Sequence, residues 1–128
     1  MPIPQLAALL ACAIFAGLGV FQAALIGGAP LGRMAWGGQH DVLPTRLRIG
    51  SAVSLALYAL FGYTALVRAD MAPALVNGTV TAVFVWGLTA YFALGVVMNG
   101  ISRSRPERLI MTPVALVLSA TYLVLALS

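Results

Sequence analysis

Four long apolar runs separated by short polar links organise this sequence. No charged side chain precedes Arg33, and charge-free runs extend from Ile49 to Val67, from Leu75 to Met98 and beyond Arg108. About 20 apolar residues in a helix span the hydrocarbon core of a bilayer. The pattern therefore predicts four transmembrane helices joined by short links.

The expected fold class is all-α, a four-transmembrane-helix bundle that forms a single membrane domain over residues 1–128. Gly27, Gly28 and Pro30 end the first helix, because glycine relaxes the backbone and proline cannot continue a helix. Ser104 followed by Glu107 fits a capping box at the start of the last helix. The helices are expected at about residues 4–26, 49–67, 75–98 and 105–127.

Composition supports the bilayer as the solvent for this chain. Apolar residues make up 62% and charged residues only 8%, whereas soluble domains have about 45–50% and about 25%. A chain of 128 residues leaves too much surface exposed to hide so many apolar side chains in a soluble core.

The basic residues are all arginines, and they lie in the links. This placement favours anionic lipid head groups as partners and argues against nucleic acid. Six of the seven lie in the first and third links, and only Arg68 lies in the second. Because positive loops stay in the cytoplasm, both termini are expected on the non-cytoplasmic side. The six are Arg33, Arg46, Arg48, Arg103, Arg105 and Arg108.

The first link, Gly27 to Pro44, is the most unusual segment, rich in glycine and containing the only histidine. Its apolar residues predict a short interfacial loop with Trp36 as an anchor. His40 beside Asp41 resembles a base and its orienting carboxylate, but adjacent loop residues seldom hold that geometry and no nucleophile is placed nearby. One histidine and one cysteine are too few for a usual metal site. No catalytic residue, metal or cofactor is predicted.

The arginines of the two links are expected to meet at one end of the bundle, where guanidinium groups can bind a phosphate or carboxylate through paired hydrogen bonds. Neutral polar groups near the same side could complete such a site. Alternatively, the arginines only set the topology and touch lipid head groups. The candidate ligand or head-group residues are Arg33, Trp36, Gln39, His40, Arg46, Arg48, Asn99, Arg103 and Arg105.

Uncharged polar residues also occur within the predicted spans. Such groups hydrogen-bond between helices or line a cavity. No span carries an ionisable acid or base near its middle, which argues against a proton-coupled pump. These polar residues are Gln22, Ser54, Tyr58, Thr64, Thr89, Tyr91, Asn99, Ser119, Thr121 and Tyr122.

The chain resembles a known group of proteins in two segments. They are GAPLGRMAWGGQHDVLPTRLR and, before a proline-containing last helix, SRSRPERL. The chain resembles a group of small four-helix bacterial membrane proteins of unknown function, from about Phe21 to Pro113. The resemblance implies four helices and a bacterial cytoplasmic (inner) membrane, and it implies no activity. Small multidrug transporters carry a carboxylate in their first helix, which is missing here.

These observations leave two functional classes open, and an enzyme is less favoured than either. The first is a non-enzymatic multi-pass membrane protein that acts as a small subunit or lipid-contacting accessory, within a homo-oligomer or a larger membrane complex. The alternative is a small oligomeric transporter or channel for a small molecule or anion. A cavity open to the arginine-rich face would favour the alternative, and a tightly packed bundle with an exposed apolar groove would favour the first.

Overall fold

The computed structural model describes all 128 residues and consists almost entirely of four long helices. Each helix is long and apolar enough to cross a membrane. The chain is therefore an all-α, multi-pass membrane protein with four candidate spans, as the apolar runs predicted. The helices are α1 (Ile3–Ile26), α2 (Thr45–Arg68), α3 (Gly78–Gly100) and α4 (Arg105–Ala126).

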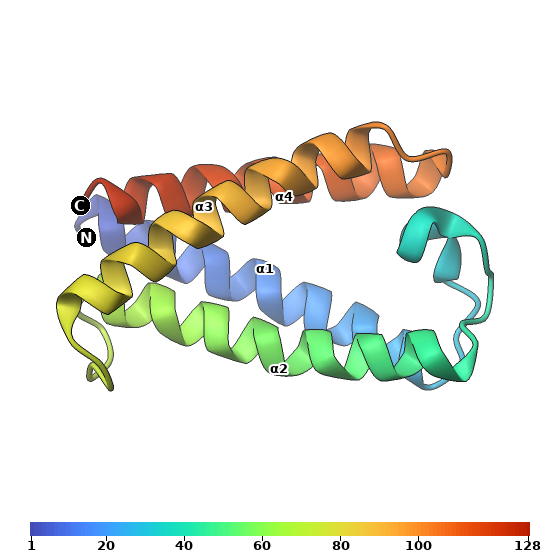
Figure 1. Cartoon of the computed structure of the whole chain (residues 1–128), viewed down its shortest axis with the longest axis horizontal. Coiled ribbons are helices and arrows are strands. Elements are labelled where there is room, and N and C mark those ends of the chain that lie inside the picture. Colours follow the sequence, from blue (N-terminus) through green and yellow to red (C-terminus); the bar gives the residue numbers. More distant parts are fainter.

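The helices form two antiparallel hairpins, α1–α2 and α3–α4 (Figure 1). Both termini and the link of residues 69–77 lie at one end, here called the terminal end. The loop of residues 27–44 and the link of residues 101–104 lie at the other, here called the loop end. The hairpins are close together at the terminal end and diverge towards the loop end (Figure 1). Within the loop, η1 (Gly32–Met34) is a single 3₁₀ turn, and η2 (Trp36–Gly38) is a tight turn with a non-helical backbone at Gly37.

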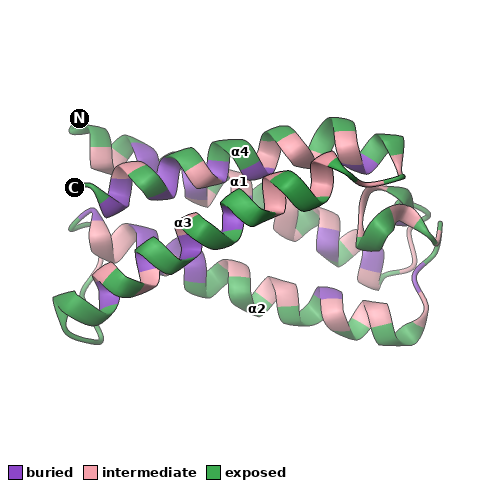
Figure 2. Ribbon diagram, turned by 45° about the horizontal axis from the view of Figure 1, so that its top comes forward, coloured by how far each residue is buried: buried purple, intermediate pink, exposed green.

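Small residues allow the helices to approach closely at the terminal end. Ala8 and Ala11 of α1 and Ala65 of α2 are completely buried, and small side chains at such positions let helix backbones pack together in a membrane. Leu88 of α3 and Leu118 of α4 complete this core. Buried residues line the inside of the bundle, and exposed residues cover its outer faces (Figure 2).

A layer of aromatic side chains crosses the bundle where the two hairpins begin to diverge. The ring of Phe92 lies 5.9 Å from that of Phe61, 6.0 Å from that of Phe15 and 5.2 Å from that of Tyr122, between centroids. The hydroxyl of Tyr122 donates to the carbonyl of Phe61, so its polar end is satisfied. Rings at these separations attract one another through their quadrupoles, and the layer joins all four helices.

Two helices begin three or more residues away from their expected starts. α2 begins at Thr45 instead of residue 49, because its first turn includes the arginines that the charge-free run left out. α3 begins at Gly78 instead of residue 75, because Asn77 caps it: the side-chain oxygen accepts a hydrogen bond from the Val80 amide.

Replacing Ala65 by leucine is expected to destabilise the bundle by about 1–3 kcal/mol, because extra methyl groups in a packed core force neighbouring helices apart. The measurement is unfolding in mixed micelles of increasing denaturing-detergent fraction. Ala56→Leu is the matched control, since Ala56 lies on an exposed face of the same helix. Equal stability of the two variants would contradict close packing at Ala65.

Candidate functional site

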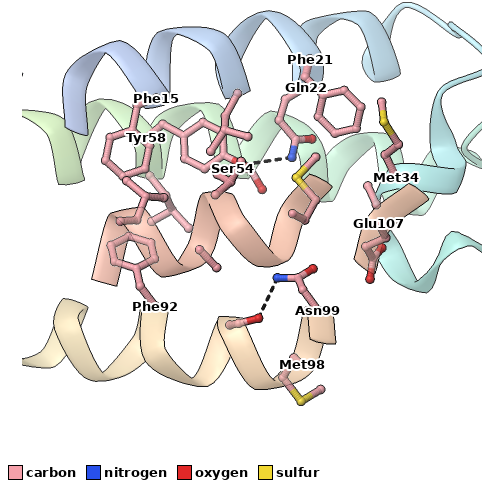
Figure 3. A pocket seen from close by; sticks show the side chains of 18 of the residues that line it. Phe15, Phe21, Gln22, Met34, Ser54, Tyr58, Phe92, Met98, Asn99 and Glu107 are labelled. Atoms are coloured by element: carbon pink, nitrogen blue, oxygen red, sulfur yellow. Dashed lines mark hydrogen bonds between the residues drawn. The ribbon is translucent and has the colours of Figure 1, made fainter. Parts of the chain in front are cut away.

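An inner cavity of about 480 Å³ lies between the diverging hairpins. All four helices and the loop contribute to its wall, and 17 of its 23 lining residues are hydrophobic. Phe15, Phe61 and Phe92 of the aromatic layer line it, and Figure 3 shows Phe15 and Phe92 at the end away from Met34 and Glu107. Ligand cavities in proteins have volumes of about 300–1,000 Å³ and mostly apolar walls, so this one is large enough for a small ligand or part of a lipid.

Gln22 places an unsatisfied polar group in this apolar wall (Figure 3). Its Nε2 donates to the Tyr58 hydroxyl at 3.1 Å, and its Oε1 has no hydrogen-bond partner. The residue is only 8% exposed. An unmatched acceptor in an apolar setting costs free energy that a hydrogen-bond donor on a ligand would recover.

Other polar groups in the wall also direct their donors towards the protein. The Asn99 amide nitrogen donates to the Gly95 carbonyl at 2.8 Å, and the Ser54 hydroxyl donates to the Gly50 carbonyl at 3.1 Å. Their oxygen atoms remain as acceptors. The inner cavity is therefore apolar overall, with a small number of hydrogen-bond acceptors and the hydroxyl groups of Tyr58 and Tyr91.

An outer cavity of about 820 Å³ adjoins the inner one at the loop end. Only two of its 13 lining residues are hydrophobic, and Arg33, Arg103 and Arg105 are among the rest. The two cavities share Gly37, Met98, Asn99 and Glu107 in their linings. An apolar cavity thus lies beside an arginine-lined one, and four residues belong to both linings.

Residues of the loop line both cavities, and the loop joins the two hairpins. On the α2 side, the Trp36 indole donates to the Ser51 hydroxyl at 3.2 Å, and its ring lies against Gly50. On the α4 side, the Ser104 hydroxyl donates to the Arg33 carbonyl. The loop was predicted to lie at the membrane interface; the structure shows that it bridges the diverging ends of the bundle.

Three consecutive loop residues adopt left-handed backbone conformations. Their φ values are +53° at Trp36, +77° at Gly37 and +72° at Gly38. Such a conformation is strained for a bulky residue such as tryptophan and persists only where the surroundings fix it. The contacts of Trp36 with Gly50 and Ser51 provide that constraint.

Glu107 is buried at the boundary between the two cavities. It is 7% exposed, and its Oε2 accepts a hydrogen bond of 3.1 Å from the Gly37 amide. The capping box predicted from sequence is wrong. The side chain of Ser104 makes no cap, and its amide donates to the Ser102 hydroxyl, so Glu107 is free to face the loop. The start of α4 still favours the carboxylate, because a helix N-terminus carries partial positive charge.

The structure brings together part of the predicted site. Arg33, Gln39, Asn99, Arg103 and Arg105 line the outer cavity, and Asn99 also lines the inner one, together with Trp36.

The remaining candidates, His40, Arg46 and Arg48, lie outside both linings. Arg48 donates instead to the Leu43 carbonyl at 2.9 Å. Asp41 forms an exposed ion pair with Arg33, 3.5 Å from Nε to Oδ1, and makes no hydrogen bond with His40.

Glu107 was not predicted as a site residue, and Gln22 and Tyr58 were predicted only as members of a longer set of polar residues within the spans. The available signal was that Glu107 is one of only three acids in the chain. Its partner, Gly37, is 70 positions away, so local spacing could not reveal the contact.

The chain was compared with protein-family models, curated proteins and solved structures, and no match was found. No group of three or more histidine, cysteine or acidic side chains is placed to hold a metal ion. Function must therefore be argued from the two cavities themselves.

Proposed function

We propose that this membrane protein binds a lipid-like amphiphile with a phosphate-bearing head group. The apolar part of the ligand occupies the inner cavity, and its phosphate lies among Arg33, Arg103 and Arg105. The observation that carries the proposal is that an apolar cavity and an arginine-lined cavity lie side by side and share four lining residues. Guanidinium groups suit phosphate because they offer planar pairs of donors.

The outer wall of the inner cavity supports entry from the bilayer. Leu57 of α2 and Leu94 and Met98 of α3 line this cavity, and all three are exposed on the outside of the bundle. An acyl chain could therefore pass between α2 and α3 without leaving an apolar environment. The head group would stay at the level of the arginines, where anionic lipid is attracted electrostatically.

The proposed orientation has the loop end in the cytoplasm of a bacterial cell and both termini outside its inner membrane. The excess of arginine at the loop end supports it. In this orientation the ligand enters from the cytoplasmic leaflet. The protein then acts as a lipid-contacting accessory, alone or within a larger membrane complex.

Transport is the second candidate function. The inner cavity adjoins the arginine-rich end, which is the feature expected of a transporter. It is lined by Phe15, Phe61 and Phe92, so passage across the membrane would require the aromatic layer to separate. Lipid movement between leaflets of reconstituted vesicles would support transport; binding without movement would leave the accessory role.

Filling the inner cavity tests the apolar half of the proposal. Ser54→Leu introduces a branched side chain into the wall, and binding of phosphatidic acid is expected to weaken at least tenfold. The measurement is native mass spectrometry of the purified protein titrated with the lipid. Ala56→Leu, on the exposed face of the same helix, is expected to bind like the wild type. Equal binding by both variants would contradict occupation of the cavity.

The proposed binding of phosphate by the arginines is tested in the same titration. Phosphatidic acid is compared with diacylglycerol of identical acyl chains, which lacks the phosphate. Wild type is expected to prefer phosphatidic acid, and Arg103→Lys to reduce that preference, because an ammonium cannot reproduce the planar guanidinium fork. Arg46→Lys is the control, since Arg46 lies at the same end outside both cavities. If all three proteins bind phosphatidic acid equally weakly and salt weakens this binding, the arginines only set the membrane topology.

A further inference from the structure

Glu107 is a buried carboxylate without a cationic partner. The only ion pair in the structure joins Arg33 to Asp41. Arg105 and Arg108 are close to Glu107 in sequence, but helix positions one or two apart do not face each other, and Arg108 donates to the Ser102 carbonyl at 3.0 Å. A buried charge is strongly disfavoured unless it is paired and hydrogen-bonded, and Glu107 has a single hydrogen bond, from the Gly37 amide.

On the inner-cavity side, two amide side chains present further acceptor atoms. Asn99, which lines both cavities with Glu107, uses its amide nitrogen on the Gly95 carbonyl and leaves its oxygen available. Deeper in the same cavity, Gln22 is more than nine-tenths buried and its Oε1 has no partner. This independent observation places an unpaired acceptor in the wall of the same cavity. The indole of Trp36, which also lines it, adds an aromatic face that attracts cations.

The arginines and the carboxylate therefore divide the site into two charged parts. Arg33, Arg103 and Arg105 suit an anion in the outer cavity, and Glu107 at the boundary suits a cation that donates hydrogen bonds. We infer that the ligand is a zwitterionic amphiphile: its ammonium group binds Glu107, and its phosphate lies among the arginines. This inference rests on the proposed function and narrows it from phosphate-bearing lipids in general to those with a protonated amine, such as phosphatidylethanolamine.

The test compares phosphatidylethanolamine with phosphatidylglycerol, because the two share phosphate and acyl chains and differ in the amine. Wild type is expected to bind phosphatidylethanolamine at least tenfold more tightly. Glu107→Gln removes the charge and keeps an oxygen that can accept from the Gly37 amide, so the loop should stay in place. In this variant the ratio of the affinities for phosphatidylethanolamine and phosphatidylglycerol is expected to fall to about one. The affinity for phosphatidylglycerol should be unchanged or higher.

Binding is followed by native mass spectrometry and by fluorescence of Trp36, which lines the inner cavity. The chain has two tryptophans, so fluorescence is measured in a Trp86→Phe background; Trp86 is exposed on α3, outside both cavities. The soluble head group glycerophosphoethanolamine is a further probe. If this head group alone binds with the affinity of the full lipid, the ammonium site is supported. The same result would contradict the need for an acyl chain in the inner cavity.

The outcomes separate this inference from the proposed function. If wild type binds both lipids equally and Glu107→Gln changes neither affinity, the ammonium site is wrong and the phospholipid site stands. If neither lipid binds, or if Ser54→Leu binds both as wild type does, the proposed function itself fails. Should Glu107→Gln not fold, the comparison of the two lipids on wild type still decides, because equal affinities overturn the inference.

Discussion

Gly38→Ala is expected to detach the loop from α4, whereas Gly37→Ala should leave it in place. Both glycines have left-handed backbones, so each alanine costs about 1–2 kcal/mol in backbone conformation. The difference lies in the space around them. A Cβ on Gly38 would collide with the Ser104 side chain and lie 2.9 Å from the Arg33 carbonyl oxygen; a Cβ on Gly37 would meet nothing within 4 Å.

The collision is expected to break the contact between Ser104 and Arg33 and then the hydrogen bond between Gly37 and Glu107. Amide hydrogen exchange in nanodiscs measures this directly. In Gly38→Ala, exchange across residues 32–38 is expected to be at least tenfold faster than in Gly37→Ala. Equal exchange would mean that backbone conformation alone holds the loop. Full exchange within seconds in the wild-type loop would contradict an ordered segment altogether.

The four helices could be predicted because the bilayer imposes a strong constraint on sequence. A spanning segment must be long, apolar and helical, so that its backbone groups bond internally. The charge-free runs therefore located all four helices. Their ends were harder to predict, because they depend on single contacts such as that between Asn77 and the Val80 amide.

The rotation of each helix could not be predicted from sequence. Lipid tails are as apolar as a protein interior, so the outer face of a span resembles the face that packs. Gln22 and Tyr58 were recognised as polar residues within spans, but their pairing depends on how α1 and α2 are turned towards each other. For the same reason, the cavity between the hairpins leaves no signature in the sequence.

The arginines were predictable as a group, because alternating helices bring the first and third links to one end. Their individual roles were not. Arg48 faces Gly28 and the Leu43 carbonyl, whereas Arg103 and Arg105 line the outer cavity. The path of the glycine-rich loop decides this difference, and three consecutive left-handed residues define that path.

Reporter fusions at Ser128 are expected to report the non-cytoplasmic side, and a reporter inserted near His40 the cytoplasmic side. The physical reason is the asymmetry of positive charge, since six of the seven arginines lie at the loop end. Alkaline phosphatase is active only outside the cytoplasm, and green fluorescent protein folds to its fluorescent form inside it. We expect opposite results at the two positions, each reporter's signal differing by at least tenfold.

The single arginine at the terminal end has a structural role that reconciles it with this orientation. Arg68 donates from Nε to the Leu125 carbonyl at 2.9 Å and from Nη2 to the carbonyls of Ala126 and Ser128 at 3.2 and 3.0 Å. It thereby caps the end of α4, where the carbonyls carry partial negative charge. Arg68→Gln is therefore expected to lower stability and to leave the reporter pattern unchanged. Strong cytoplasmic reporter activity at Ser128 in wild type would reverse the orientation, and with it the leaflet from which a ligand reaches the cavity.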